Sequence, residues 1–277
     1  MYRDVLIPLL TYLDAVDDAS IDAAIDVALG FGAAATGLVV EADLVLAAGV
    51  YADPSVYLPD LMVEAERQGR NRGDALTARF RERAQAKRLE QDVQVIRGLS
   101  GGVIDEVANR ARFHDVTVFP LDPDNPIARD CAEGVIFSSG RPVLLLPKGA
   151  PAPSARRIVV AWDGSRNAAR ATADAMPLLQ RAEQVTVVRV TDLKGPENGD
   201  GAALRAHFVR HGLDVRYAET AAGGEGVAGQ LRRFAGEAGA DLLVMGGYGH
   251  SRMREFILGG LTRDLLHAPF MPVLMAH

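Results

Sequence analysis

Short apolar runs alternate along the chain with longer segments of helical periodicity. In the C-terminal part, the apolar runs predict strands at residues 158–162, 185–190, 215–217, 242–245 and 273–275. Helical patterns lie between them, at residues 167–180, 202–211 and 227–238. Strands that alternate with helices indicate parallel βαβ units. Because the runs are apolar throughout, we expect helices on both faces of the sheet.

The same pattern occurs twice. Similar segments recur in the same order, at 4–9 and 157–162, 92–95 and 214–217, 115–120 and 241–246, and 141–147 and 271–276. We interpret this as two copies of one unit, residues 1–148 and 156–277, joined by a Pro-containing linker. The predicted fold class is α/β, with two tandem doubly wound parallel sheets of about five strands each. The first copy is longer near residues 41–70, where we expect a loop with a helical extension.

Composition and charge narrow the function classes. The 277 residues are 48% hydrophobic and 24% charged, which is typical of a globular protein. The net charge is −6 and no block of basic residues is present, which argues against nucleic acid as a partner. Cys131 is the one cysteine, so neither a disulfide framework nor a Cys-based zinc site is expected, and a structural role as a small hydrophobe is favoured. The apolar runs are too short to cross a membrane and the first strand leaves no room for a signal peptide, so we expect a cytoplasmic protein.

Candidate binding chemistry follows the strands of the second copy. In doubly wound sheets, ligands bind beyond the carboxyl ends of the strands where the strand order reverses. Two glycine clusters follow strand 242–245, first Gly246-Gly247-Tyr248-Gly249 and then Gly259-Gly260. Glycines can adopt positive φ and let a ligand approach the main chain, and successive N–H groups attract anions. The two clusters could hold a polyphosphate, although the first could also be only a tight turn.

A carboxylate stands opposite the glycine clusters. Asp163 follows the first strand of the second copy and could accept hydrogen bonds from a ribose or an adenine amino group. The alternative is a helix cap or turn residue, but Ser165 can serve as the cap instead.

Together these residues resemble the universal stress protein family. The resemblance rests on Gly246-x-x-Gly249, nine residues, Gly259 and a small residue, with Asp163-Gly164-Ser165 after the first strand. It implies a five-stranded parallel sheet of the adenine nucleotide α-hydrolase type, a tandem member, and ATP as ligand, with or without magnesium. By this resemblance the nucleotide-binding residues are Ala161, Asp163, Val190, Met245, Gly246, Gly249, Ser251, Arg252, Gly259, Gly260, Leu261 and Thr262. Gly260 departs from the family pattern, which usually has Ser or Thr at this position.

The first copy lacks these features. Leu10 stands where the second copy has Asp163, and residues 120–126 contain three prolines and two aspartates in place of the glycine loop. Proline removes N–H donors and the carboxylates repel phosphate. We therefore expect no ATP in the first copy and a structural role for it. The alternative is another, uncharged ligand bound with the help of segment 41–70.

The leading hypothesis is a cytoplasmic universal stress protein that binds ATP in its C-terminal copy as a regulatory ligand. No general base or activated nucleophile is evident, so at most slow hydrolysis is expected. The closing strands 143–146 and 273–275 resemble those through which family members pair, so we expect an intramolecular pseudo-dimer, and a further homodimer is compatible with this. The alternatives are a nucleotide-free interaction scaffold and a true enzyme of the wider α-hydrolase group.

Overall fold

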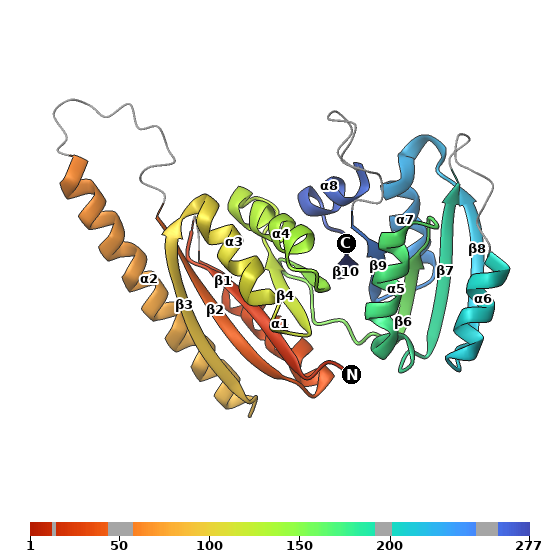
Figure 1. Ribbon diagram of the computed structural model, residues 1–277, viewed down its shortest axis with the longest axis horizontal. Coiled ribbons are helices and arrows are strands. Elements are labelled where there is room, and N and C mark those ends of the chain that lie inside the picture. Colours follow the sequence, from red (N-terminus) through yellow and green to blue (C-terminus); the bar gives the residue numbers. More distant parts are fainter. Residues whose placement is uncertain (13–14, 44–57, 192–200, 248–259) are drawn as a thin grey trace.

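A computed structural model describes residues 1–12, 15–43, 58–191, 201–247 and 260–277 (Figure 1). The elements of the N-terminal half are β1 (Asp4–Leu10), α1 (Asp18–Phe31), β2 (Ala34–Asp43), α2 (Leu58–Ala86), β3 (Gln91–Leu99), α3 (Ser100–Ala111), β4 (Val116–Leu121), α4 (Pro126–Ser138) and β5 (Val143–Pro147). Those of the C-terminal half are β6 (Arg157–Ala161), α5 (Arg166–Leu179), β7 (Gln184–Thr191), α6 (Gly201–Arg210), β8 (Val215–Ala221), a short 3₁₀ turn (Gly223–Glu225), α7 (Gly226–Glu237), β9 (Leu242–Gly246), α8 (Gly260–His267) and β10 (Val273–Ala276).

The described strands form one ten-stranded sheet in the order β3-β2-β1-β4-β5-β10-β9-β6-β7-β8. Within each half, neighbouring strands are parallel. The halves meet where β5 pairs antiparallel with β10, with Leu144 opposite Leu274. The strand order reverses twice, between β1 and β4 and between β6 and β9. The predicted α/β class with parallel, doubly wound strands is therefore confirmed.

Helices cover both faces of the sheet, as the apolar strands predicted (Figure 1). Helices α1, α2, α5 and α6 contribute to one buried cluster, and α3, α4, α7 and α8 contribute to the other. Each cluster contains residues from both halves, because alternate side chains of the paired strands β5 and β10 point to opposite faces. Leu144 and Leu274 belong to the first cluster, and Leu145 and Met275 belong to the second. The apolar core is therefore continuous across the junction.

Helix α2 accounts for part of the extra length of the first half. A loop with a helical extension was expected near residues 41–70, and α2 begins within that range at Leu58, with 29 residues against 10 in its counterpart α6. Residues 44–57 lie outside the described ranges. Leu76, Phe80 and Ala84 form the buried stripe with which the C-terminal part of α2 packs on the sheet.

The ends of strands β8 and β6 also differ from the prediction. Strand β8 continues four residues beyond the predicted end at Tyr217, to Ala221, because it pairs along the full length of β7. Strand β6 ends at Ala161 rather than Trp162, although the Trp162 amide still donates to the Val188 carbonyl at 2.9 Å.

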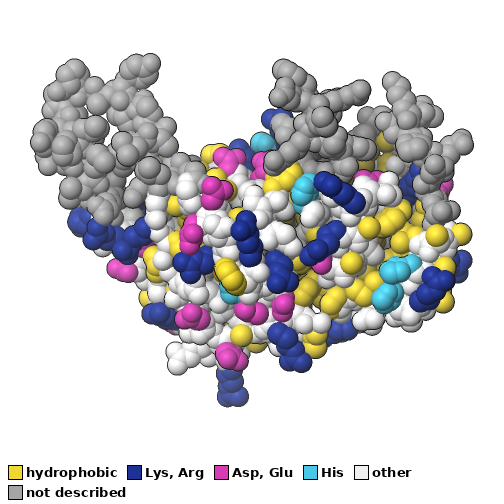
Figure 2. Space-filling view, viewed as in Figure 1, with side chains coloured by type: hydrophobic (Ala, Val, Ile, Leu, Met, Phe, Trp, Pro, Cys, Tyr) yellow, Lys and Arg dark blue, Asp and Glu magenta, His cyan; other side chains and the backbone are white. Residues whose placement is uncertain are grey.

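Surface charge and the lone cysteine follow the sequence reasoning. On the face that Figure 2 shows, basic and acidic side chains are interspersed over the described surface. Cys131 is buried in α4, and burial, together with the nearby charge of Asp130, raises the pKa of its thiol to about 12. Such a thiol is packed and unreactive.

Among the helices of the described ranges, none has both the length and the apolar character that a bilayer crossing requires.

Candidate nucleotide site

A pocket of about 380 Å³ lies at the carboxyl ends of β6, β7 and β9, where the strand order reverses. This volume includes space that is open to solvent, so the pocket is a cleft at the surface of the molecule. The residues that line it are Ala161, Trp162, Asp163, Val188, Val190, Val227, Leu231, Met245, Gly246 and Leu261. The walls are thus largely aliphatic, with one carboxylate and a glycine backbone at the rim. Such walls suit an aromatic base, and the carboxylate suits a group that donates hydrogen bonds.

Asp163 stands exposed at the rim of this pocket. One of its carboxylate oxygens accepts a hydrogen bond from the Ser165 amide at 2.9 Å, which fixes the side chain in a local turn. Ser165 is the N-cap of α5, and its hydroxyl accepts from the Ala168 amide at 3.1 Å. The cap is therefore supplied by Ser165, as expected, and the carboxylate of Asp163 faces the pocket with accepting capacity left over.

Gly246, at the end of β9, is needed for close packing. Glycines can adopt positive φ, but neither Gly246 nor Gly247 does so. A Cβ atom at Gly246 would lie 2.5 Å from the Ala168 amide nitrogen and 2.6 Å from the Asn167 carbonyl carbon. Gly246 therefore allows α5 to pack directly against the strand end, which brings the N-terminus of this helix next to the pocket.

The second glycine cluster leads into α8, which begins at Gly260. Leu261 lines the pocket, whereas the Thr262 side chain is only 2% exposed and is not part of the lining. The structure therefore brings Leu261, but not the Thr262 hydroxyl, to the same space as Asp163 and Gly246. Gly249, Ser251, Arg252 and Gly259 lie outside the described residues.

Several lining residues were not identified from the sequence. Trp162 and Val188 come from the strands that supply the predicted residues, whereas Val227 and Leu231 come from α7. Val188 could have been found from strand periodicity, because it lies two residues before Val190 and so points to the same face. The α7 residues carry no such signal, because helical periodicity shows only that they face the sheet.

The matching position in the N-terminal half is occupied by internal polar contacts. A pocket of about 360 Å³ lies at the ends of β1 and β4, lined in part by Leu10, Asp17, Asp122, Asn125 and Lys148. Lys148 Nζ pairs with Asp122 at 2.7 Å. The Asn125 side chain accepts from the amides of Ile127 and Ala128, the first free N–H groups of α4. The groups that would receive a phosphate are therefore already satisfied.

Possible metal ligands do not converge in the described part of the chain. Across residues 1–12, 15–43, 58–191, 201–247 and 260–277, no three His, Cys, Asp or Glu side chains are grouped as a metal site requires. At the pocket of the C-terminal half, Asp163 is the one carboxylate among the described lining residues.

Comparison with known proteins agrees with this geometry. Residues 154–277 match the model of the Universal stress protein family. A universal stress protein from Archaeoglobus fulgidus DSM 4304 has a similar structure, with a TM-score of 0.70 and 15% identity over 98% of this chain and 95% of that chain. A protein from Pseudomonas aeruginosa UCBPP-PA14 that is assigned to the universal stress proteins has a TM-score of 0.56 and 17% identity over 99% of this chain and 93% of that chain. No curated protein matches the chain with significance.

The C-terminal half of the chain is therefore a universal stress protein domain. The glycine spacing and Asp163-Gly164-Ser165 predicted this family, and the family match confirms it. The two structural matches extend over nearly the whole chain, so they show that the fold is shared by both halves, and they fit a two-domain arrangement.

Proposed function

We propose that this chain is a two-domain universal stress protein, with domains at 1–148 and 156–277, that binds ATP in its C-terminal domain as a regulatory ligand. The observation that carries the proposal is the pocket at the ends of β6, β7 and β9. It combines aliphatic walls for adenine, the Asp163 carboxylate for the nucleoside, and the Gly246 backbone next to the N-terminus of α5. The glycines of the 246–260 segment continue this site in the sequence.

The proposed role is regulation rather than rapid catalysis. Among the described residues that line the pocket, Asp163 is the one titratable side chain, and it already accepts from the Ser165 amide. A general base must reach the proton that it abstracts, and no second candidate lines the described walls. A bound nucleotide would then act by linkage, because a ligand that prefers one conformation shifts the population toward it.

We propose a structural role for the N-terminal domain. The internal pairs of Asp122 with Lys148 and of Asn125 with the start of α4 occupy its equivalent pocket. Its last strand pairs with the last strand of the C-terminal domain, so the two domains form an intramolecular pseudo-dimer in this proposal.

Fluorescence of the one tryptophan tests the proposal, because Trp162 lines the pocket. ATP should change this fluorescence in a saturable way, and Asp163→Ala should weaken binding by about tenfold or more, since a hydrogen bond to a charged group contributes about 1.5–3 kcal/mol. The matched control is Asp214→Ala, which removes a carboxylate that is 94% exposed and remote from the pocket. No saturable response in the unmodified protein would reject nucleotide binding and leave the scaffold hypothesis. Equal affinities in both variants would show that ATP binds without Asp163 and would reject this site.

A further inference from the structure

Helix α4 of the N-terminal half contacts the start of the glycine segment in the C-terminal half. A Cβ atom at Gly247 would lie 2.9 Å from Cγ2 of Ile136, a side chain that is 1% exposed. Gly247 is itself buried. The backbone directly after β9, at Gly247, therefore rests on a side chain from the other half.

A second contact reaches the same glycine through His277. The Phe137 ring of α4 packs edge-on against the His277 ring, with centroids 4.9 Å apart. His277 Nδ1 lies 3.0 Å from the Gly247 carbonyl oxygen and 2.8 Å from Asn167 Nδ2. Asn167 Nδ2 donates to the Gly247 carbonyl at 2.6 Å. With the ring proton on Nε2, Nδ1 can accept the second amide proton of Asn167, and with the proton on Nδ1 the ring donates to the Gly247 carbonyl. In either tautomer His277 joins the polar contacts at Gly247.

The far end of the glycine segment is contacted as well. Helix α8, which begins at Gly260 and supplies Leu261 to the pocket, packs against α4 (Figure 1). The Gly247 amide donates to the Ala276 carbonyl at 2.8 Å, which ties the near end to β10. Helix α4 therefore borders the described residues on both sides of the segment 248–259.

We infer that α4 of the N-terminal domain is a positioning element of the nucleotide site, acting on Gly247 through Ile136 and through the Phe137–His277 contact. This inference rests on the proposed function and goes beyond it, because it gives the domain without a nucleotide site a direct part in phosphate binding. Small rearrangements in a packed interface alter ligand affinity, typically by about 0.5–2 kcal/mol, or about two- to thirtyfold.

The ratio of ATP affinity to adenosine affinity distinguishes positioning from general destabilisation. Adenosine would engage the nucleoside side of the pocket, at Ala161, Asp163 and Val190, whereas the phosphates need the glycine segment. Ile136→Ala should lower ATP affinity between about two- and thirtyfold and leave adenosine affinity unchanged. His277→Phe keeps the ring contact with Phe137 but removes Nδ1, and it should have the same selective effect. Trp162 fluorescence reports both ligands.

The matched control is Ile104→Ala on α3. Ile104 packs on the opposite side of α4, where a Cβ atom at Gly134 would lie 2.3 Å from its Cγ2 atom, so the same truncation is made away from Gly247. Its ATP-to-adenosine ratio should equal that of the unmodified protein. If Ile136→Ala does not fold, Ile136→Val provides the milder truncation.

Two results would overturn the inference, and they are distinguishable. If the unmodified protein binds neither ATP nor adenosine, the proposed function fails and the inference fails with it. If ATP binds but Ile136→Ala and His277→Phe leave its affinity unchanged, or lower both ligands in parallel as Ile104→Ala would, only the positioning role fails.

Discussion

The aspartates that precede β4 and β9 show how single residues repeat between the halves for structural reasons. Asp115 Oδ2 accepts from the amides of Arg3 and Asp4 at 2.7 and 3.1 Å. Asp241 does the same for the amides of Arg156 and Arg157, at 3.1 and 3.2 Å. Each carboxylate accepts hydrogen bonds from the amides at the start of a central strand. These amides would otherwise lack partners where the strand begins. The sequence match at these positions therefore reflects strand initiation in both halves.

Gly246 gives the sharpest test at the level of one atom. In Gly246→Ala the new Cβ would meet the backbone of α5, at Ala168 N and Asn167 C, and neither atom can move without displacing the helix. We expect a loss of about 1–3 kcal/mol in the free energy of unfolding, measured by urea denaturation, and a weaker ATP response of Trp162. An unchanged stability would show that α5 does not pack as described.

The control for this substitution is Gly236→Ala on α7. Nothing lies within 4 Å of a Cβ atom at this position. Alanine is a better helix former than glycine, so this change should stabilise the protein by about 0.5–1 kcal/mol. The two glycine substitutions should thus have opposite signs.

The sequence could predict those site residues that lie at the carboxyl end of a strand, because this position alone brings them to the pocket. Asp163 and Met245 follow or end apolar strands, so the carboxyl-end rule located them. Thr262 was predicted from the motif, and its side chain is buried at the start of α8 without being among the lining residues of the pocket. The contact between Asn167 and His277 could not be predicted, because the two residues lie 110 positions apart in the chain and only the folded structure brings them together.

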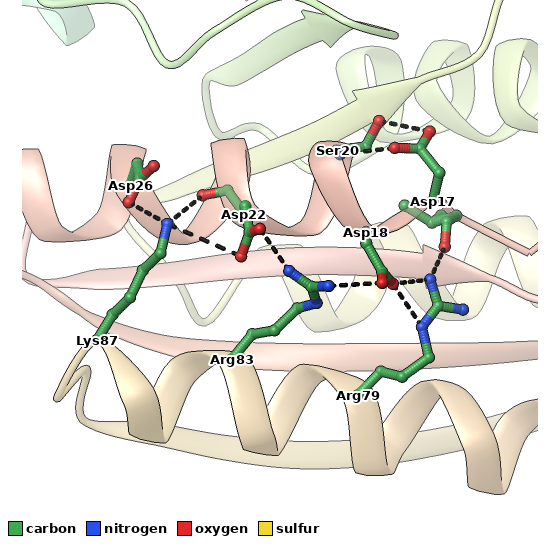
Figure 3. A network of polar contacts seen from close by, with 9 residues as sticks. Asp17, Asp18, Ser20, Asp22, Asp26, Arg79, Arg83 and Lys87 are labelled. Atoms are coloured by element: carbon green, nitrogen blue, oxygen red, sulfur yellow. Dashed lines mark hydrogen bonds and ion pairs between the residues drawn. The ribbon is translucent and has the colours of Figure 1, made fainter.

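At the level of elements, α1 and α2 are joined by a ladder of ion pairs (Figure 3). Asp18, Asp22 and Asp26 lie four residues apart on α1. Their partners also lie four residues apart, with Arg79 and Arg83 on α2 and Lys87 directly after its end. In the stretch 67–88, basic and acidic residues are interspersed, which is typical of a solvated helix face. The periodicity of four is visible on each helix, but nothing in the sequence registers one helix against the other.

Acid and salt should weaken this ladder. The hydrogen bond from Arg79 is the main cause that holds the pKa of the Asp18 carboxyl below its usual value. Desolvation opposes it, and the hydrogen bond from Arg83 adds to it. A folded-state pKa below the unfolded one stabilises the protein above the unfolded value of about 3.9, and this contribution disappears as the pH falls through the folded pKa. The Arg83–Asp22 pair, about one-third exposed on each side, contributes roughly 0.2–1 kcal/mol.

Arg83→Gln measures the ladder directly. Its urea midpoint should be lower than that of the unmodified protein at pH 7 and low salt. The difference should shrink in 1 M salt, where the screening length is about 3 Å, and also as the pH falls below about 4. The matched control is Arg81→Gln, because Arg81 is exposed on the same helix. A difference that is insensitive to both pH and salt would mean that Arg83 acts through packing alone.

At the level of the whole molecule, the junction determines how the halves behave together. The sequence predicted that the closing strands pair with each other, and β5 and β10 do so. It did not predict that both apolar clusters would run through the junction, because cluster continuity depends on which face each strand residue takes in the paired register. The Tyr2 hydroxyl also donates to the Asp174 carbonyl at 2.6 Å, which links β1 to α5.

A continuous core predicts that the two halves unfold as one unit. Leu76 on α2 and Leu204 on α6 are buried in the same cluster at opposite ends of the sheet. Either leucine-to-alanine substitution should remove about 2–5 kcal/mol of stability.

Because Trp162 lies in the C-terminal half, its fluorescence reports whether the loss in α2 reaches that half. Leu76→Ala and Leu204→Ala should both lower the urea midpoint seen by Trp162, and each midpoint should coincide with that from far-UV circular dichroism. If Leu76→Ala shifts only the circular dichroism transition, the halves unfold independently. The antiparallel β5–β10 pair would then join two separate folding units. In that case, any effect of α4 on Gly247 would come from contacts in the folded protein and not from shared stability of the two halves.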